Sequence, residues 1–233
     1  MLDNKYKKLS IVIPVYNEKE TLSQILKAVD GVQISLEKEI ILIDDASTDG
    51  TTEILKGMSD RGYKIIFSEK NKGKGFAVKK GFQNATGDLI LIQDADLEYD
   101  PNEYDKLLQP ILDGRADVVF SSRFLGGSAH RVLYFWHYLA NRFLTILSNM
   151  FTDLNLTDME SCYKVFTKEV LDSFKNDLQS KRFGIEPELT ARCAKGKWRI
   201  YEVSISYHGR TYTEGKKIGW KDGVSAIWTI IRN

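Results

Sequence analysis

Short apolar runs alternate with amphipathic stretches over the first 125 residues of the chain. The apolar runs cover residues 10–15, 39–43, 63–67, 88–92 and 116–121. Runs of this length are typical of strands that are buried on both faces of a sheet. Helical patterns lie between them, near 19–29, 50–58, 74–84 and 101–113. This alternation predicts an α/β fold, with a mostly parallel sheet and flanking crossover helices.

A longer helical pattern follows in residues 132–151. Apolar side chains recur there at helical spacing, at Val132, Trp136, Leu139, Phe143, Leu147 and Met150. Polar side chains lie on another face, at His137, Asn141, Thr145 and Ser148. The segment would form an amphipathic helix of roughly 30 Å, and a second apolar face is expected between Gly219 and Ile231. Such faces fit either packing on the chain's own domain or a position in a membrane interface.

Two carboxylates, Asp94 and Asp96, follow the predicted strand 88–92. In an extended chain the side chains of residues i and i+2 point to the same side, and Glu98 continues this alternation. Carboxylate oxygens are hard ligands that suit Mg²⁺ or Mn²⁺, with the phosphates of a substrate completing the coordination. The alternative is a pair of turn-forming aspartates that caps the helix after Pro101. The first interpretation predicts a divalent metal site at Asp94, Asp96 and Glu98.

Polar residues also end two other predicted strands. Tyr16 and Glu18 come after the first strand, and Asp44 and Asp45 come after the second. Ligands of open parallel sheets bind beyond the carboxyl ends of the strands. We therefore expect these side chains to converge with Asp94 on one polar site, although Asp44 could instead cap its own loop.

The segment NKGKG at 71–75 places Lys74 between two glycines. Its spacing fits neither the dinucleotide-binding fingerprint nor the P-loop. The glycines let the backbone either turn into the next helix or approach a ligand, and Lys74 is available to a phosphate.

Several short motifs occur in a specific order along the chain. They are PVYNE at 14–18, DDASTDGT at 44–51, NKGKG at 71–75, DAD at 94–96, SSRF at 121–124, DMESCYKVF at 158–166 and GKKIGW at 215–220. Each motif alone is weak, but the ordered set resembles the family-two glycosyltransferases with the GT-A fold. Within that family it is most similar to the polyprenyl-phosphate sugar transferases of the dolichyl-phosphate mannose synthase type. The resemblance covers nearly the whole chain.

The resemblance implies an inverting, metal-dependent transfer of a hexose from a nucleotide sugar, GDP-mannose or UDP-glucose, to a polyprenyl phosphate. The donor would contact Pro14, Tyr16, Glu18, Asp45, Lys74 and Asp94. Asp96 and Arg123 would be the catalytic residues, and the cofactor would be Mg²⁺ or Mn²⁺. Glu98 stands where mannose synthases tend to have Gln, and Cys162 stands where they usually have Gly. These departures leave the identity of the donor sugar open.

The acceptor determines which other side chains the reaction needs. A phosphomonoester, with a second pKa of about 6, is already largely ionised at neutral pH and needs cations rather than a base. Arg123 follows the fifth predicted strand and can bind a phosphate through two parallel hydrogen bonds. Further candidates for this contact are Arg131, His137, Arg210 and Lys217. For each of these side chains, an ordinary surface ion pair is the alternative.

Two rival functions stay open. A saccharide-extending transferase with a hydroxyl acceptor would need a carboxylate base such as Glu186 or Glu188. At a helix start, however, an acidic residue is more often a partner of the helix dipole. A sugar-phosphate nucleotidyltransferase also uses an acidic metal site, but its usual Gly-rich loop is missing after the first predicted strand.

The composition of the chain limits which binding partners and which cellular location can be expected. The net charge of +1 gives no case for nucleic-acid binding. Cys162 and Cys193 lack metal-ligand spacing, which predicts free thiols in a reducing cytosol. No run of about 20 apolar residues is present, so no spanning helix is expected. We expect a cytoplasmic enzyme, peripheral on the inner face of the membrane, and either a homo-oligomer or a membrane-protein partner would be compatible with that location. One catalytic domain would combine a nucleotide-sugar-binding half, 1–125, with an acceptor-binding half, 126–233.

Overall fold

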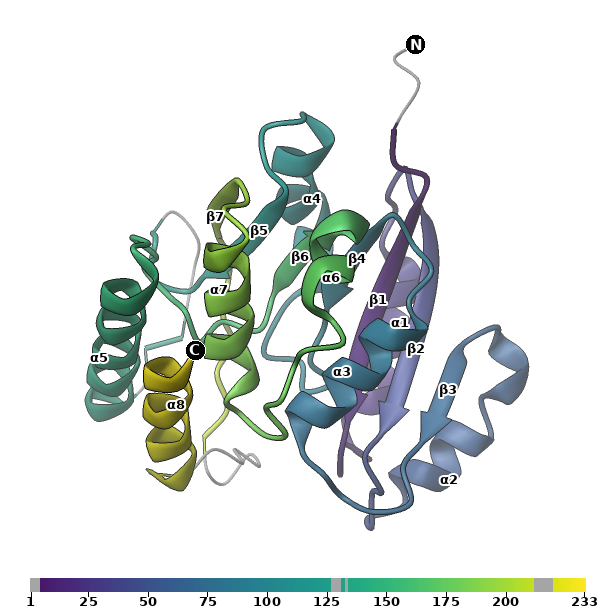
Figure 1. Ribbon diagram of the computed structural model, residues 1–233. Helices are drawn as coiled ribbons and strands as arrows, with labels where there is room; N and C mark the ends of the chain where they lie inside the picture. Colours follow the sequence, from purple (N-terminus) through teal and green to yellow (C-terminus); the bar gives the residue numbers. More distant parts are fainter. Residues whose placement is uncertain (1–4, 127–130, 133, 212–219) are drawn as a thin grey trace.

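The computed structural model describes residues 5–126, 131–132, 134–211 and 220–233 (Figure 1). Within these residues, seven strands form one sheet in the order β3-β2-β1-β4-β6-β5-β7. The strands are β1 (Lys8–Val15), β2 (Glu37–Asp44), β3 (Lys64–Phe67), β4 (Leu89–Ile92), β5 (Val118–Ser122), β6 (Lys164–Thr167) and β7 (Ile200–Ser204). β6 is antiparallel to β4 and β5, and the other pairs are parallel. The predicted α/β class with a mostly parallel sheet is confirmed.

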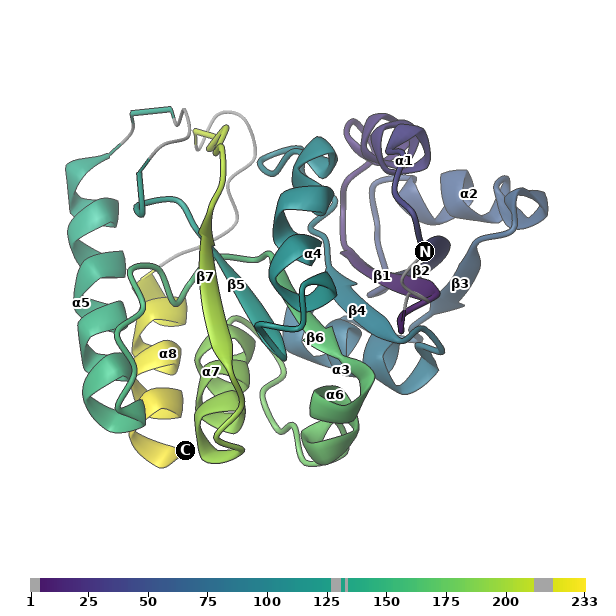
Figure 2. The same cartoon turned by 90° about the horizontal axis from the view of Figure 1, so that it is seen from above.

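Helices cover both faces of this sheet. They are α1 (Leu22–Gly31), α2 (Thr51–Lys56), α3 (Lys74–Asn84), α4 (Tyr104–Leu112), α5 (Phe135–Thr152), α6 (Lys168–Phe174), α7 (Ile185–Lys195) and α8 (Trp220–Arg232), with short 3-10 turns at Ser59–Arg61 and Pro101–Glu103. Viewed from above, α1 and α4 lie on one side of the sheet, and α3, α6 and α7 lie on the other (Figure 2). Helices α5 and α8 pack against each other and against α7.

The five predicted strands all form, and all of them except β3 are largely buried. The side chains of Leu9, Ile11, Ile41 and Leu91 are completely buried, as expected for strands covered on both faces. Helix α3 lies very close to β1, because Gly81 has no side chain. A Cβ atom at this position would clash with the side chain of Val12. The apolar runs therefore become the core that fixes the strand ends.

Strands β6 and β7 were not among the predicted elements. They belong to the second half of the chain but pair with β4 and β5 of the first half. One continuous sheet therefore crosses the predicted division at residue 125.

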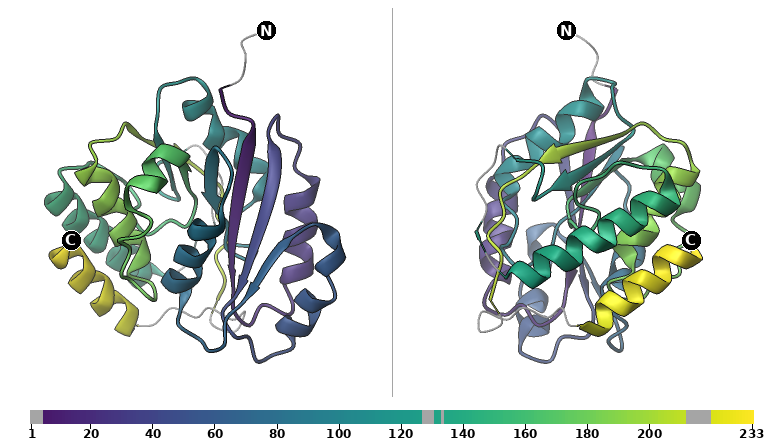
Figure 3. Two further views of the ribbon diagram at one scale, coloured as in Figure 1. Left: turned by 45° about the vertical axis from the view of Figure 1, so that its right-hand side comes forward. Right: turned by 90° about the vertical axis from the view of Figure 1, so that its left-hand side faces the viewer.

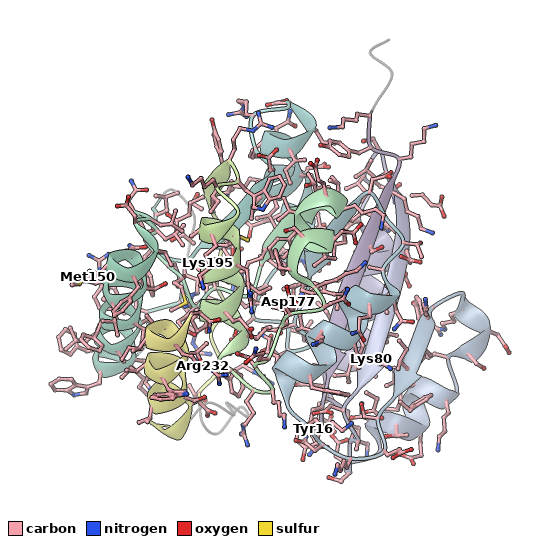
Figure 4. All side chains as sticks on the ribbon, in the orientation of Figure 1. Tyr16, Lys80, Met150, Asp177, Lys195 and Arg232 are labelled. Atoms are coloured by element: carbon pink, nitrogen blue, oxygen red, sulfur yellow. The ribbon has the colours of Figure 1, made fainter. Side chains whose placement is uncertain are left out.

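The apolar face of α5 points away from the protein. The buried positions of this helix are Leu144, Thr145 and Ser148, whereas Trp136 and Met150 are each 75% exposed. Figure 3 shows α5 and α8 side by side on one flank of the molecule. In Figure 4, the labelled Met150 lies on the outer side of α5. Of the two alternatives left open by the sequence, packing of this face on its own domain therefore does not hold for most of its length.

Helix α8 repeats this arrangement. Ala226 and Ile230 pack inwards, while Val224, Trp228 and Ile231 are more than half exposed. Among the described helices, none is both long and apolar enough to cross a bilayer. Together α5 and α8, with Val132 just before α5, present what we call the apolar flank: Val132, Phe135, Trp136, Leu139, Phe143, Ile146, Met150, Phe151, Val224, Trp228 and Ile231.

Candidate active site

A cavity of about 640 Å³ opens at the carboxyl ends of the central strands. Pro14, Tyr16 and Glu18 reach it from the end of β1, and Asp94 and Asp96 reach it from the end of β4. In Figure 4, the labelled Tyr16 marks this end of the sheet. β1 lies between β2 and β4 in parallel register, so the three strands end at the same edge. The structure thus brings the predicted donor-binding side chains together.

The two aspartates at the end of β2 have different surroundings. Asp44 accepts hydrogen bonds from Ser47 and Thr52, so it caps its own loop. Asp45 lines the cavity and accepts from the backbone N–H groups of Lys72 and Gly73. Asp45 therefore fixes the start of α3 relative to β2.

Gly73 and Gly75 allow the start of α3 to pack closely against the backbone of residues 180–182. A Cβ atom at Gly73 would meet the carbonyl oxygen of Lys181, and one at Gly75 would meet that of Ser180. The segment around Ser180 is held in turn by Glu188, which accepts from the N–H groups of residues 179 and 180. This packing brings Arg182, the next residue after Lys181, to the cavity wall.

Lys74 connects two acidic side chains inside the cavity. Its Nζ lies 2.9 Å from Oδ2 of Asp94 and 2.9 Å from Oε1 of Glu186, at the start of α7. Burial acts to lower the pKa of Lys74, but the neighbouring charges, led by Asp94, raise it well above its usual value. The ammonium group is therefore a fixed positive charge next to Asp94.

Arg210 supplies a second cation to the same acidic cluster. Its guanidinium lies 3.1 Å from Asp96, 3.4 Å from Glu18 and 3.6 Å from Glu98. Burial, followed by repulsion from Asp94 and Glu98, raises the pKa of Asp96 to about 7. The carboxylates at the end of β4 are therefore crowded and only partly neutralised by the chain's own cations.

The predicted metal ligands meet at this cluster. Asp94, Asp96 and Glu98 all line the cavity, and their oxygens are the donors that Mg²⁺ and Mn²⁺ prefer. Among the residues that the structure describes, no three acidic, His or Cys side chains are arranged to hold a metal by themselves. The donor set therefore fits a cation that shares its coordination with substrate phosphates.

Arg123 lies at the cavity wall in a buried ion pair. Its Nε and Nη2 atoms lie 2.7 and 2.8 Å from the two oxygens of Asp158, and its guanidinium faces the ring of Tyr207 at 5.1 Å. The alternative of an ion pair was expected at the surface, but this one is buried. Only the remaining N–H groups of Arg123 are available to a phosphate.

Of the other residues predicted to contact the phosphate, only some of those that the structure describes line the cavity. His137 of α5 and Arg210 line the cavity. Arg131 is absent from the cavity wall, and it binds the Gly209 carbonyl through its guanidinium, at 3.1 Å. It therefore braces the segment that carries Arg210. Lys217 lies outside the described residues.

Several cavity residues were not predicted as site residues. They are Glu160, Cys162, Arg182, Phe183, Tyr207 and Asp222. Glu186, which was expected to be only a helix-dipole partner, does lie in the first turn of α7 but also faces the cavity. Glu188 is absent from the cavity wall, so it cannot act there as a base. Cys162 and Cys193 are free, as predicted, and the structure shows that both are also buried.

Glu160 makes the stability of the fold depend on pH. Burial, followed by the charge of Glu186, raises its pKa to about 8. The folded chain then holds this proton more tightly than the unfolded chain, so the free energy of unfolding should fall as pH rises from about 5 to 8. Each pKa unit corresponds to about 1.4 kcal/mol. Glu160→Gln should therefore flatten this decline by a few kcal/mol, as measured by urea unfolding at both pH values. The exposed Glu53→Gln should not, and equal pH profiles for wild type and Glu160→Gln would contradict the prediction.

Comparisons with known proteins show which family the chain belongs to. The family profile described as "Glycosyl transferase family 2" matches residues 10–174. The chain is 30% identical over 216 residues to the dolichol-phosphate mannosyltransferase of Pyrococcus furiosus, covering 91% of this chain and 60% of that protein. It is also 30% identical over 221 residues to the undecaprenyl-phosphate 4-deoxy-4-formamido-L-arabinose transferase of Aeromonas hydrophila, covering 93% and 64%. The chain thus spans less than two thirds of the length of these relatives.

Solved structures with the same fold include the glucosyl-3-phosphoglycerate synthase of Mycobacterium tuberculosis. Its complex with Mn²⁺, UDP and glucosyl-3-phosphoglycerate matches with a TM-score of 0.74 at 20% identity, covering 97% of this chain and 79% of that one. Its complex with Mg²⁺ and UDP matches with a TM-score of 0.71. The predicted GT-A fold is confirmed, and the chain belongs to glycosyl transferase family 2.

Proposed function

We propose that this glycosyltransferase moves a hexose from a nucleotide sugar to a polyprenyl phosphate, with inversion at the anomeric carbon. The observation that carries the proposal is the pairing of Asp94 with Lys74 and of Asp96 with Arg210 in one cavity. The carboxylates would hold Mg²⁺ or Mn²⁺, which would stabilise the charge that develops on the departing diphosphate. Lys74 and Arg210, once released from the carboxylates, would bind the same phosphates.

The polyprenyl phosphate is supported by the relatives and by the cations of the cavity. Both named relatives carry a polyprenyl phosphate in their names. A phosphate acceptor needs positive charge rather than a base, and Arg123, His137 and Arg210 all line the cavity. The division into a donor half, 1–125, and an acceptor half, 126–233, is part of the same proposal.

The apolar flank supports work at a membrane surface. Trp136, His137 and Leu144 of α5 and Ala226 of α8 also line the cavity, so the flank is continuous with the proposed acceptor side. A polyprenyl chain stays in the bilayer, because each buried CH₂ contributes about 0.8 kcal/mol. An enzyme that uses such an acceptor must therefore come to the membrane, and the apolar flank is the surface that fits it. The two free thiols support the cytoplasmic side of that membrane.

A hydroxyl acceptor is the second candidate, because Glu186 faces the cavity and could take a proton. Its Oε1 atom is already paired with Lys74, so only its Oε2 atom is open to the proton of a hydroxyl acceptor. Transfer to soluble sugars, with a strong loss of turnover in Glu186→Gln, would favour this rival over the lipid phosphate.

Thermal-shift measurements across nucleotide sugars test the donor. A ligand that binds only the folded state raises the melting temperature by mass action. We expect GDP-mannose or UDP-glucose to raise it, more strongly with Mn²⁺ or Mg²⁺ than in excess chelator. A protein that no nucleotide sugar stabilises, or that releases pyrophosphate from a nucleoside triphosphate and a sugar phosphate, would contradict the proposal.

A further inference from the structure

We propose that Glu186 and Glu160 form the subsite that binds hydroxyl groups of the transferred sugar, and that the donor is therefore a neutral sugar with free hydroxyls at this depth. This inference rests on the proposed function and assigns part of its specificity to two carboxyl groups. Both side chains line the cavity, one from the start of α7 and one from the segment before β6.

Glu186 has an unused acceptor in the wall of the cavity. The residue is 5% exposed, and its Oε1 atom pairs with Lys74. Its Oε2 atom is buried and accepts no hydrogen bond from any residue that the structure describes. A buried carboxylate oxygen without a donor is energetically unfavourable, so most such atoms in proteins have a partner. A ligand in the cavity can supply that partner.

Glu160 supplies a second buried carboxyl oxygen that lacks a partner, in the wall of the same cavity. Its Oε1 atom also lacks a hydrogen-bond partner within the described chain. The nearest basic side chain of its own segment, Lys164, is committed elsewhere, because its Nζ donates to the carbonyl oxygens of Met159 and Ser161. Since burial raises the pKa of Glu160 to about 8, the group is largely protonated near neutral pH. It can then donate a hydrogen bond as well as accept one.

The position of these groups fits the sugar rather than the phosphates. Contacts run from Asp94 through Lys74 to Glu186, so the subsite adjoins the proposed diphosphate position. Carboxylates repel phosphate oxygens but accept from hydroxyl groups, each of which has one donor and two acceptor lone pairs. Lys74 already balances the charge of Glu186, so a cationic amino sugar is not required. A neutral hexose satisfies both carboxyl groups.

Calorimetric titration can separate the sugar from the rest of the donor. Wild type, Glu186→Gln, Glu160→Gln and the exposed control Glu169→Gln are titrated with UDP, UDP-glucose, GDP and GDP-mannose in Mn²⁺. We expect each cavity variant to bind the preferred nucleoside diphosphate within about twofold of wild type. For the nucleotide sugar, Glu186→Gln should lose ten- to hundredfold in affinity, as is typical for a hydrogen bond to a charged group, whereas Glu160→Gln, which replaces a largely neutral carboxyl group, should lose about two- to tenfold. A monodeoxy analogue that lacks the hydroxyl group bound by the subsite should bind wild type more weakly than the parent donor does. The cavity variant should not distinguish this analogue from the parent.

Each alternative outcome is distinct. If wild type binds no nucleotide sugar at all, the proposed function and the subsite both fail. If wild type binds the donor but each variant changes its affinity for diphosphate and nucleotide sugar equally, the carboxyl groups are structural and only the subsite is wrong. If Glu186→Gln keeps its donor affinity and loses turnover together with the acidic limb of the pH–rate profile, Glu186 is a base, and its assignment to the subsite is overturned.

Discussion

Asp96→Asn is expected to remove most transferase activity, with a loss on the order of a hundredfold or more. The side chain sits at the end of β4, between Glu98 and the guanidinium of Arg210. A neutral amide oxygen is a weaker ligand for a divalent cation than a carboxylate. Losing one carboxylate of a shared metal site removes several kcal/mol of transition-state stabilisation, and each 1.4 kcal/mol is about a factor of ten in rate. Turnover of the donor that thermal shift identifies is the measurement.

The fold of this variant should survive. Asn has nearly the same shape as Asp, and its neutral side chain relieves the repulsion among the carboxylates of the cluster. The variant should melt close to wild type, and the extra stabilisation by nucleotide sugar in Mn²⁺ should disappear. Asp105→Asn, at an exposed position of α4, serves as the matched control and should keep its activity. Full activity of wild type in excess chelator, or of Asp96→Asn in Mn²⁺, would show that no metal is held here.

The central strands could be predicted because local chemistry determines them. An uninterrupted run such as Leu89–Ile92 is stable only if both of its faces are covered. The strands β6 and β7 could not be predicted in this way. β6 has four residues, and one of them is the buried Lys164, whose ammonium group is satisfied by backbone carbonyls of its own segment. These hydrogen bonds form only in the folded chain. In the sequence alone, Lys164 therefore makes this segment look too polar for a buried strand.

The site was predictable as far as strand ends determine it. Parallel neighbours place Tyr16, Asp45 and Asp94 at one edge whatever the rest of the chain does. Pairings between distant segments were not predictable. The contact of Lys74 with Glu186 and that of Arg123 with Asp158 each join segments far apart in sequence, and no local pattern marks them.

The orientation of α5 required the tertiary structure. Periodicity predicted an apolar and a polar face, and the usual rule would bury the apolar one. In the structure the orientation is the opposite, because His137 and Asn141 of the polar face line the cavity. With Thr145 and Ser148 buried, the apolar face has to point outwards.

Phe143→Glu combined with Trp228→Glu is expected to abolish binding to anionic liposomes. These side chains are 55% and 65% exposed on α5 and α8, and neither lines the cavity. Inserting one large apolar side chain into a bilayer interface contributes about 1.5–3 kcal/mol, and a carboxylate opposes both insertion and approach to anionic headgroups. The double change should therefore lower partitioning by on the order of a hundredfold or more. Co-sedimentation with vesicles measures this loss directly.

The same variant should bind the donor as wild type does, because the cavity is unchanged, while turnover with a polyprenyl phosphate in vesicles falls. With a short-chain, water-soluble acceptor phosphate, turnover should recover, because the substrate no longer has to be met at a membrane. Phe67→Glu offers a matched control, since Phe67 is 45% exposed on β3, at the opposite edge of the sheet from β7. If wild type ignores anionic vesicles, or if the double variant binds them as well as wild type does, the apolar flank is not a membrane surface. The polyprenyl phosphate would then lose its main physical support, and the hydroxyl acceptor would become the better proposal.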